Sequence, residues 1–468
     1  MKSGVKMKKI VIGVDDFVNL KLPYEIKTYC ERVFYSCLFQ GIVKYDGEQI
    51  VPGLCDSYLV LNNGSKYVFK FGTKKWSNGE TIFAGDIFNM FFMIFENYSL
   101  YACAEQLLVI KNSVDFVEGK CSFDEVGIDV RDNTLIILLE YGNIDFLTIL
   151  TSCMYSPCFY TTLDNRLHTV TNGPFYLANV NKDKMEITVR RNPYYNISTN
   201  VEEIVFKTVT SREQQELLYE ENKIDITCNT LYPISFDSKI KIYKSQLLYS
   251  LHINPNLKIG NSIRKIIQKK INKIDWESLS RAFNKDNSFV VCSTDCISKE
   301  FMKKENLEKN LKTSHRNCKL IYADYYPNII VAYKIKEILE NLEFKIEMSA
   351  VDYKLFPIYL EQNNYDFLIS IISPPNSAYS TIVGMFIGYS ELEDKEDEYI
   401  ELVCKYFECM EKEEMQKQIL VKLENILREK LPVIPICRLN AMYKIKDNIM
   451  GFVYNKNGIP TFENINIK

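Results

Sequence analysis

The stretch that decides the fold is YVFKFGTKKWSNGETIFAGDIFNMFFMIFEN, residues 67–97, in which a strand, a turn and a helix follow one another. From Tyr67 to Phe71 aromatic residues alternate with other side chains, which is the period of a strand with one buried face. The residues from Ser77 to Gly79 tolerate the positive φ angles of a tight turn. Asp86 can cap a helix whose apolar residues run from Ile87 to Phe95. The stretch therefore predicts a strand–turn–helix unit.

A second informative stretch begins at Leu320 and reads LYADYYPNIIVAYKIKEILENLEFKIEMSAVDYKLFPIYLEQNNYDFLISII. Its apolar spacing predicts strand, turn, helix, strand, helix and strand, with the first helix at residues 329–341. On that helix the expected apolar face comprises Ile330, Ala332, Tyr333, Ile335, Ile338 and Leu339. Strands that alternate with helices favour parallel pairing and right-handed crossovers. This part of the chain is expected to be α/β.

Composition limits the class of protein. The chain has 468 residues, is 47% hydrophobic and 13% aromatic, and can therefore bury the cores of two or three domains. Its formal charge is −3 and the charges are mixed along the chain, so nucleic acid is not an expected partner. No stretch approaches the roughly 18 apolar residues that a membrane span needs. We expect a folded protein without membrane insertion.

The N-terminus and the cysteines bear on the compartment. After MKSGVKMKK, the apolar run from Ile10 to Val14 is interrupted by Asp15 and Asp16, and Cys30 lacks the small neighbours of a lipidation site. The fourteen cysteines are scattered, and the closest pairs are Cys153/Cys158, Cys292/Cys296 and Cys404/Cys409. We expect reduced thiols and neither an export signal nor an anchor.

The search for catalytic motifs finds no phosphate-binding loop, no H-E-x-x-H, no G-x-S-x-G and no G-x-G-x-x-G after a strand. The three histidines, His168, His252 and His315, do not form a cysteine–histidine quartet in the sequence. We therefore expect a binding protein instead of an enzyme, with no catalytic residue, no metal site and no cofactor.

The order of motifs resembles the peptide/nickel-type extracellular solute-binding proteins (family 5), the receptor subunits of ABC importers. Residues 67–97 are similar to the family signature "strand, K-W-S-D/N-G, x-x-x-A-D-D, helix", with Gly85 in place of the first Asp. Further blocks resemble the family in the same order: VFYSCLFQGIVKYDGEQIVPGLCDSY from Val33, NGPFYLANVNKDKMEITVRRNPYY from Asn172, LYSLHINPN from Leu248 followed by IRKIIQKKINK, and LPVIPICRLNAMYKIKDNIMGFVYNKNG from Leu431.

The resemblance implies an α/β, two-lobed periplasmic-binding-protein-like fold of class II, with an extra subdomain in the first lobe and a ligand cleft between the lobes. Lobe I is expected to comprise residues 7–45, 160–254 and 432–468, its inserted subdomain residues 46–159, and lobe II residues 255–431. Two hinge crossings are expected, with Tyr249, Asn254, Leu431 and Pro435 as the hinge residues.

The resemblance also implies which loops bind the ligand. They are the loop after the first strand, the segments before the G-P-Y block, and the loop after the "Y-D" strand of lobe II. Mapped onto this sequence, and with aromatic residues added as walls, the candidate ligand-binding residues are Asp16, Phe17, Asn19, Tyr35, Phe39, Met154, Tyr155, Asn172, Ser370, Ser373, Pro375, Asn376 and Tyr379.

The loop of residues 370–379 departs from the family pattern. Peptide receptors carry an Asp here that pairs with the α-ammonium of the ligand, whereas this loop has no acid and no Trp. A buried ammonium without a counter-ion costs several kcal/mol. Asp15, Asp16 or Asp324 can replace the missing acid, and the sequence does not select among them.

The function implied is that of a solute-binding protein of an ABC-type importer, which binds an oligopeptide or another small polar solute by hinge closure. The alternative is an intracellular ligand sensor or accessory protein that keeps the fold without a transport role. The expected partners are the ligand and, for the first function, ABC permease subunits, and we expect a monomer. The family is extracytoplasmic, whereas the N-terminus and the cysteines leave a cytoplasmic location open.

Overall fold

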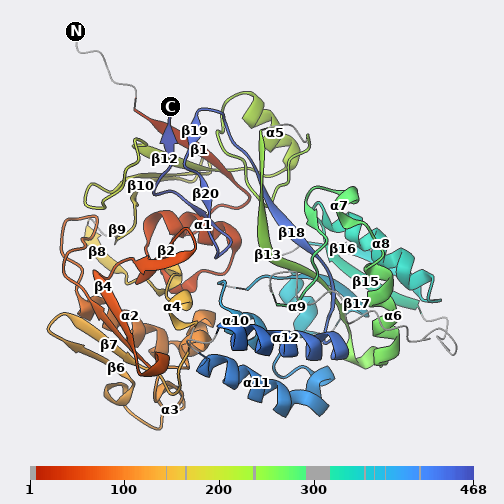
Figure 1. Cartoon of the computed structure of the whole chain (residues 1–468). Coiled ribbons are helices and arrows are strands. Elements are labelled where there is room, and N and C mark those ends of the chain that lie inside the picture. Colours follow the sequence, from red (N-terminus) through yellow and green to blue (C-terminus); the bar gives the residue numbers. More distant parts are fainter. Residues whose placement is uncertain are drawn as a thin grey trace. The chain divides into compact units, whose positions relative to one another are not determined.

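The computed structural model describes residues 7–143, 145–163, 166–235, 239–290, 317–352, 355–362, 364–374, 376–409 and 413–468. The chain divides into two compact units, and Figure 1 labels most of their helices and strands. The first unit comprises Met1–Lys241, Asn376–Ala378 and Tyr443–Lys468, and the second comprises Ile242–Pro375 and Tyr379–Met442.

The first unit contains a sheet of strand order β1-β12-β11-β10, formed by Lys9–Val14, Glu203–Thr208, Glu186–Arg191 and Phe175–Asn181. β1 pairs parallel to β12, and the other pairs are antiparallel. Helix α1 (Tyr29–Leu38) begins at Thr28, whose hydroxyl accepts from the N–H of Glu31 at 3.2 Å. The Glu31 carboxylate accepts from the N–H of Thr28 in return, at 3.0 Å, so the start of α1 is a complete capping box.

A second sheet of the first unit has the order β4-β5-β7-β6, formed by Ser57–Leu61, Lys66–Lys70, Thr134–Leu138 and Ile128–Arg131. In β5 the side chains of Tyr67 and Phe69 are buried and that of Lys70 is exposed, as the alternation predicts. Helix α2 (Ala84–Glu96) packs on this sheet.

The predicted turn and helix start of the 67–97 stretch are present, with one difference. Gly79 has φ +89° and its N–H donates to the Trp76 carbonyl at 2.9 Å, while Trp76 is buried. The helix begins earlier than the sequence predicts, because Asp86 caps it from within the first turn by accepting from the N–H of Phe83 at 2.8 Å.

The remaining strands of the first unit are β2 (Val43–Asp46), β3 (Gln49–Pro52), β8 (Phe159–Leu163), β9 (Arg166–Val170), β19 (Ile449–Met450), β20 (Val453–Tyr454), β21 (Pro460–Thr461) and β22 (Asn466–Ile467). Its remaining helices are α3 (Ser113–Val117), α4 (Phe146–Ile149), α5 (Arg212–Glu220) and the 3₁₀ helices η1 (Pro23–Glu25), η2 (Asn62–Gly64), η3 (Tyr98–Leu100), η4 (Ala102–Leu107), η5 (Phe123–Glu125) and η6 (Cys153–Tyr155).

The second unit is built on a mixed sheet of order β14-β18-β13-β17-β15-β16, formed by Phe283–Asn284, Ile434–Lys444, Ile240–Ile253, Phe367–Ile372, Asn317–Ala323 and Lys345–Val351. β15 pairs parallel to both β16 and β17. The prediction of a parallel βαβ arrangement after residue 320 is therefore confirmed. The chain enters this unit within β13 and leaves it within β18.

Helix α8 (Asn328–Glu340) joins β15 to β16, and its buried face comprises Val331, Ala332, Ile335, Ile338 and Leu339. Tyr333 was predicted on this face, but the prediction is wrong because 61% of its surface is exposed. With 3.6 residues per turn, position 333 lies one step of about 100° beyond Ala332 and turns away from the sheet.

The other helices of the second unit are η7 (Pro255–Leu257), α6 (Asn261–Ile271), α7 (Trp276–Leu279), α9 (Phe356–Glu361), α10 (Tyr379–Gly384), η9 (Ser390–Lys395), α11 (Glu396–Glu408) and α12 (Glu413–Lys430). Helices α11 and α12 pack against each other, and α6 packs against α8.

Candidate ligand-binding site

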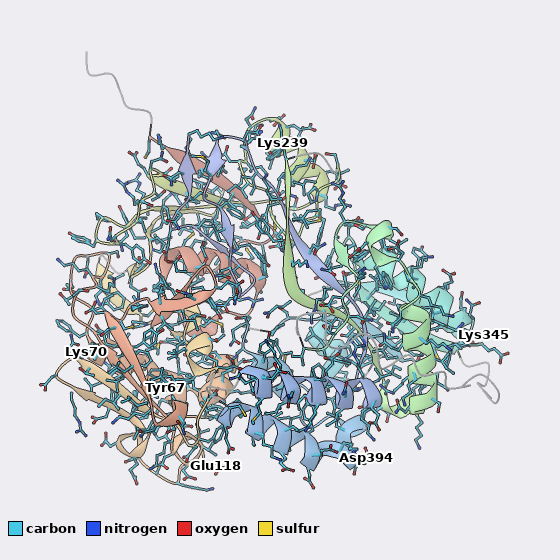
Figure 2. All side chains as sticks on the ribbon, viewed as in Figure 1. Tyr67, Lys70, Glu118, Lys239, Lys345 and Asp394 are labelled. Atoms are coloured by element: carbon cyan, nitrogen blue, oxygen red, sulfur yellow. The ribbon has the colours of Figure 1, made fainter. Side chains whose placement is uncertain are left out.

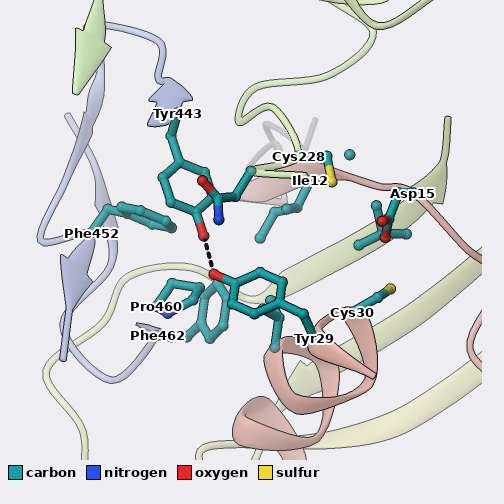
Figure 3. A pocket seen from close by; sticks show the side chains of 13 residues that line it. Ile12, Asp15, Tyr29, Cys30, Cys228, Tyr443, Phe452, Pro460 and Phe462 are labelled. Carbon is teal, nitrogen blue, oxygen red and sulfur yellow. Dashed lines mark hydrogen bonds between the residues drawn. The ribbon is translucent and has the colours of Figure 1, made fainter. Parts of the chain in front are cut away.

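The first unit has a small cavity at the carboxyl end of β1, shown in Figure 3. Its volume is about 20 Å³, enough for one water molecule, since a water needs roughly 10–15 Å³ of such space. The lining residues are Ile12, Gly13, Val14, Asp15, Tyr29, Cys30, Val33, Cys228, Asn229, Tyr443, Phe452, Pro460 and Phe462. The carboxyl ends of parallel strands are where open α/β sheets place their ligands.

Asp15 is the charged residue of this lining. Its Oδ1 atom is buried and has no hydrogen-bond partner within the described residues, whereas the Thr230 hydroxyl hydrogen bonds to the same carboxyl group. Removal from water raises the pKa of Asp15, and the hydrogen bond from Thr230 opposes this rise only in part. A carboxyl group with one unused buried oxygen can accept a hydrogen bond from a small donor in the cavity.

Two thiols lie beside this carboxyl group. The Cys228 sulfur lies 2.8 Å from the Thr230 hydroxyl, and the Cys30 thiol donates to the carbonyl of Asp16 at 3.4 Å. Burial raises the pKa of Cys228 to about 12 and that of Cys30 well above its ordinary value, with Asp15 as the next cause for both. These thiols therefore stay protonated near neutral pH and are poor nucleophiles.

The predicted ligand residues of the first loop differ in exposure. Asp16 and Phe17 are half-buried and Asn19 is exposed, and the Asp16 carboxylate accepts from the N–H of Phe17 at 2.9 Å. Tyr35 and Phe39 are buried, with their rings stacked 5.9 Å apart. The Tyr35 hydroxyl donates to the carbonyl of Lys21 at 2.6 Å, which fixes the end of this loop.

The predicted residues before the G-P-Y block are buried as well. Tyr155 donates its hydroxyl hydrogen to the carbonyl of Cys103 at 3.0 Å, and Met154 lies in the same 3₁₀ helix. The side chain of Asn172 accepts from the N–H of Gln40 at 2.9 Å and donates to the Ser156 hydroxyl at 2.9 Å. The donor and acceptor groups of the Asn172 amide are thus used within the protein.

The predicted residues of the loop after β17 are spread over different environments. Ser370 is half-buried within β17, Ser373 is exposed, and Tyr379 is half-buried at the start of α10. Asn376, in the first unit, is 1% exposed and donates to the Gln106 side chain at 2.6 Å. Pro375 lies outside the described residues.

The predicted hinge residues all lie in the second unit, which the chain enters between Lys241 and Ile242 and leaves between Met442 and Tyr443. Tyr249 is buried and hydrogen bonds to Asn328, and the Asn254 amide donates to the carbonyl of Tyr365 at 2.5 Å. Leu431 has φ +49°, and the Pro435 carbonyl accepts from Gln268 at 3.0 Å.

The sequence analysis did not select the other residues that face Asp15. Cys228, Asn229 and Thr230 follow Ile226, which forms a parallel bridge with Ile12 of β1. The aromatic walls come from the C-terminal segment, where Phe452 lies in the V-x-G-F block. This juxtaposition depends on contacts between residues more than 200 positions apart, and a local sequence pattern carries no signal for it.

No group of three or more His, Cys, Asp or Glu side chains in the described part of the chain is arranged to hold a metal ion. Cys292, Cys296 and His315 lie outside the described residues. The described cysteines are free thiols. A search of the described helices finds none that is both long and apolar enough to cross a membrane.

A family model matches the middle of the chain. Residues 49–274 match the model of the bacterial extracellular solute-binding proteins, family 5 (middle region), so the resemblance seen in the sequence is confirmed. A search of curated sequences found no match.

Solved structures with the same fold cover nearly the whole chain. The murein tripeptide-binding protein MppA of Escherichia coli is 16% identical, with 99% of both chains covered and a TM-score of 0.77. OppA of Haemophilus influenzae, in complex with RPPGFSPFR, is 17% identical with 99% of both chains covered and a TM-score of 0.76. OppA of Listeria monocytogenes, bound to peptide, is 17% identical with the same coverage and a TM-score of 0.72. The chain therefore has the two-lobed α/β fold of these proteins, as predicted.

Proposed function

Because residues 49–274 are the middle region of a family 5 bacterial extracellular solute-binding protein, we propose that this chain binds a peptide or another small polar solute for an ABC importer. The observation that carries the proposal is this family match, together with a fold shared over 99% of the chain with the murein tripeptide-binding protein MppA and with OppA in complex with a peptide. We further propose that the chain has no catalytic activity and that its partners are the solute and the permease subunits.

The lobe boundaries, the ligand contacts and the residues that position the ligand-binding loops remain proposals. The lobe boundaries are residues 7–45, 160–254 and 432–468 for lobe I, 46–159 for its subdomain, and 255–431 for lobe II. The ligand contacts are the predicted loop residues that keep exposed surface, namely Asp16, Phe17, Asn19, Ser370, Ser373 and Tyr379. The buried Tyr35, Phe39, Met154, Tyr155 and Asn172 position these loops through packing and hydrogen bonds.

The solute is proposed to lack an ordinary free α-amine. The loop after β17 has no acid, and Asn376 in that loop already donates to Gln106. Ser373 is exposed and offers a hydroxyl group instead of a charge. An ammonium group at this loop therefore loses water without gaining a counter-ion.

A thermal-shift screen tests the function. Pools of di- to pentapeptides, the same peptides with N-acetyl groups, and uncharged polar solutes are added to the purified chain. A bound solute at one hundred times its Kd stabilises the fold by about 2.7 kcal/mol, which raises the Tm clearly. We expect N-acetylated or uncharged solutes to stabilise more than free-amine peptides.

A pair of variants sharpens this screen. Ser373→Asp places a carboxylate on the exposed position of the loop and should improve binding of free-amine peptides, whereas Ser373→Asn changes the size similarly without the charge. Strong stabilisation of the unmodified chain by free-amine peptides, lost on acetylation, would refute the proposed ligand preference. Stabilisation by no peptide or small polar solute would count against solute binding itself and favour an accessory protein.

A further inference from the structure

The second unit has a larger cavity, and none of the predicted ligand residues lines it. Its volume is about 250 Å³, and its lining includes Lys258, Arg264, Lys430, Ser390 and Glu391. One water needs roughly 10–15 Å³ of such space, so the cavity can hold a multi-atom ligand together with several waters. Three cationic side chains and one carboxylate give this lining a formal charge of +2.

Arg264 and Glu391 form a fixed pair in the wall of the cavity. Arg264 is 4% exposed, and its Nη2 atom lies 2.6 Å from Oε1 of Glu391. Its Nη1 atom donates to the carbonyl of Leu431 at 3.0 Å, which holds the guanidinium in place. The charges of this pair compensate each other, and the positive excess of the cavity comes from the two lysines.

The two lysines are available to a ligand. Lys258 is exposed and makes no ion pair with any described residue. The ammonium of Lys430 pairs with Asp394, whose side chain is 68% exposed and does not line the cavity. The Lys430 side chain is 14% exposed, but its partner Asp394 lies largely in solvent, which screens the pair, so an anion in the cavity can compete with Asp394 for Lys430.

The start of α6 adds to this positive potential. Helix α6 begins at Asn261, and its N-cap is Gly260, which has no side chain to cap the first N–H groups. The N-terminal end of a helix carries a partial positive charge. The side chain of Asn261, which also lines the cavity, donates to the carbonyl of Glu429 at 2.8 Å and does not compete for a ligand.

We propose that this cavity binds a doubly charged oxyanion, namely phosphate or the phosphoryl group of a phosphomonoester. A phosphomonoester carries about −1.5 to −2 charges at pH 7, which matches the +2 of the lining once the anion replaces Asp394 as the partner of Lys430, whereas a single carboxylate then leaves one lysine uncompensated. The hydroxyl of Ser390 donates to Oε2 of Glu391 at 3.2 Å and would have to turn from this partner to donate to the anion. All lining residues belong to the second unit, and the proposal does not depend on the proposed solute function.

The test uses the full chain and inorganic phosphate as the probe. Binding is measured by calorimetry and by Tm in a low-salt buffer, with sodium chloride at equal ionic strength as the reference. Lys258→Gln should weaken phosphate binding about fivefold or more, because Lys258 is the lysine of the lining that no described ion pair compensates. Asp394→Asn should tighten it by up to about fivefold, because Lys430 is released from its partner.

The control variant is Lys345→Gln, on an exposed lysine of β16 in the same unit, and it should leave binding unchanged. Lys345 and Asp394 are labelled in Figure 2. These substitutions change exposed side chains, so each variant is expected to fold. A general effect of net charge would make Lys258→Gln and Lys345→Gln lose the same affinity, so the difference between these two variants separates a site from such an effect.

The same binding measurement with a phosphosugar, and with vesicles that contain an anionic phospholipid, identifies the source of the phosphoryl group. Binding of inorganic phosphate or the phosphosugar, sensitive to Lys258, supports a soluble anion. Binding of the vesicles alone points to a lipid headgroup as the source. Equal effects of phosphate and chloride, or equal losses in the Lys258 and Lys345 variants, would overturn the proposal.

Discussion

The hydroxyl oxygens of Tyr29 and Tyr443 lie 2.7 Å apart and join helix α1 to strand β18 across 414 positions of the chain. Figure 3 shows this hydrogen bond in the wall of the cavity beside Asp15. The Tyr443 ring also packs edge to face on Phe452, with ring centroids 5.0 Å apart. Burial raises the pKa of Tyr29 well above its ordinary value, so the pair remains protonated and hydrogen-bonded over the physiological pH range.

Tyr29→Phe and Tyr443→Phe are each expected to lower the free energy of unfolding by about 1 kcal/mol, since each leaves a buried hydroxyl without this partner. The double variant should cost less than the sum of the two, because the same hydrogen bond is lost in both. Urea unfolding of the four proteins measures the coupling. Strict additivity would show that the two hydroxyls do not interact.

Asp15→Asn is expected to stabilise the fold increasingly as the pH rises. Because burial raises the folded-state pKa of Asp15, this group favours the folded state below its ordinary pKa. This stabilising contribution of Asp15 is lost as the pH rises through its raised pKa. The neutral amide of the Asp15→Asn variant does not titrate, so the variant keeps its stability. Comparing the Tm of variant and parent between pH 4 and pH 8 measures the effect. Asp324→Asn, at an exposed carboxylate, serves as the control, and a pH-independent difference for Asp15→Asn would contradict the prediction.

His252 should make the protein less stable in mild acid. Burial, assisted by the nearby Arg264 charge, lowers the pKa of His252 from 6.5 to about 4. The unfolded chain therefore binds a proton between these pH values that the folded chain does not bind, and the Tm should fall as the pH drops from about 6.5 to about 4. His252→Gln cannot titrate and should show a smaller fall. An unchanged pH profile in this variant would assign the acid sensitivity to other groups.

Two glycines should respond in opposite ways to alanine. Gly451 has φ +72°, and a Cβ atom there would lie 1.8 Å from the carbonyl oxygen of Asn464, so Gly451→Ala should cost about 3 kcal/mol or more. Gly85 lies in the first turn of α2 with open space around it, and Gly85→Ala should stabilise by up to about 1 kcal/mol. Chemical denaturation measures the free energy of unfolding of both variants. Equal changes in the two variants would contradict the prediction.

The cysteines are expected to be reduced. A thiol titration in denaturant on freshly purified protein should count close to the fourteen cysteines of the sequence. The free state of the described cysteines and the burial of Cys37, Cys153 and Cys437 agree with this expectation. A count far below fourteen would indicate disulfides and an oxidising compartment.

The fold could be predicted where local patterns carry it. The alternation in Tyr67 to Phe71, the turn at Gly79 and the helix around Asp86 depend on neighbouring residues, and all three are present. The βαβ segment after residue 320 followed in the same way from its alternating periods. The error at Tyr333 shows the limit, because an aromatic residue beside an apolar face looks buried in the sequence until the helix phase is known.

The candidate site could be predicted only in part. The sequence placed Asp15 and Asp16 after the first strand, and selected Asn172 and Tyr155 from their place beside family motifs. The sequence could not show that the Asn172 side-chain amide hydrogen bonds to Gln40 and Ser156, since these hydrogen bonds depend on where distant segments meet.

The sequence by itself showed the resemblance to the family through its ordered motifs. It also determined the α/β character and the order of the elements, because hydrophobic period, turn residues and caps act over a few positions. Only the tertiary structure decided which polar groups are hydrogen-bonded within the protein and which are available to a ligand. Segments more than 200 residues away, among them Cys228 and Thr230, lie against Asp15, and its buried Oδ1 atom has no hydrogen-bond partner in the described part of the chain. Lys258 and Lys430 line one cavity because the segment that leads into α6 and the end of α12 meet there, where Asn261 donates to the carbonyl of Glu429. Burial and the convergence of distant charges are properties of packing, and no local stretch of sequence encodes them.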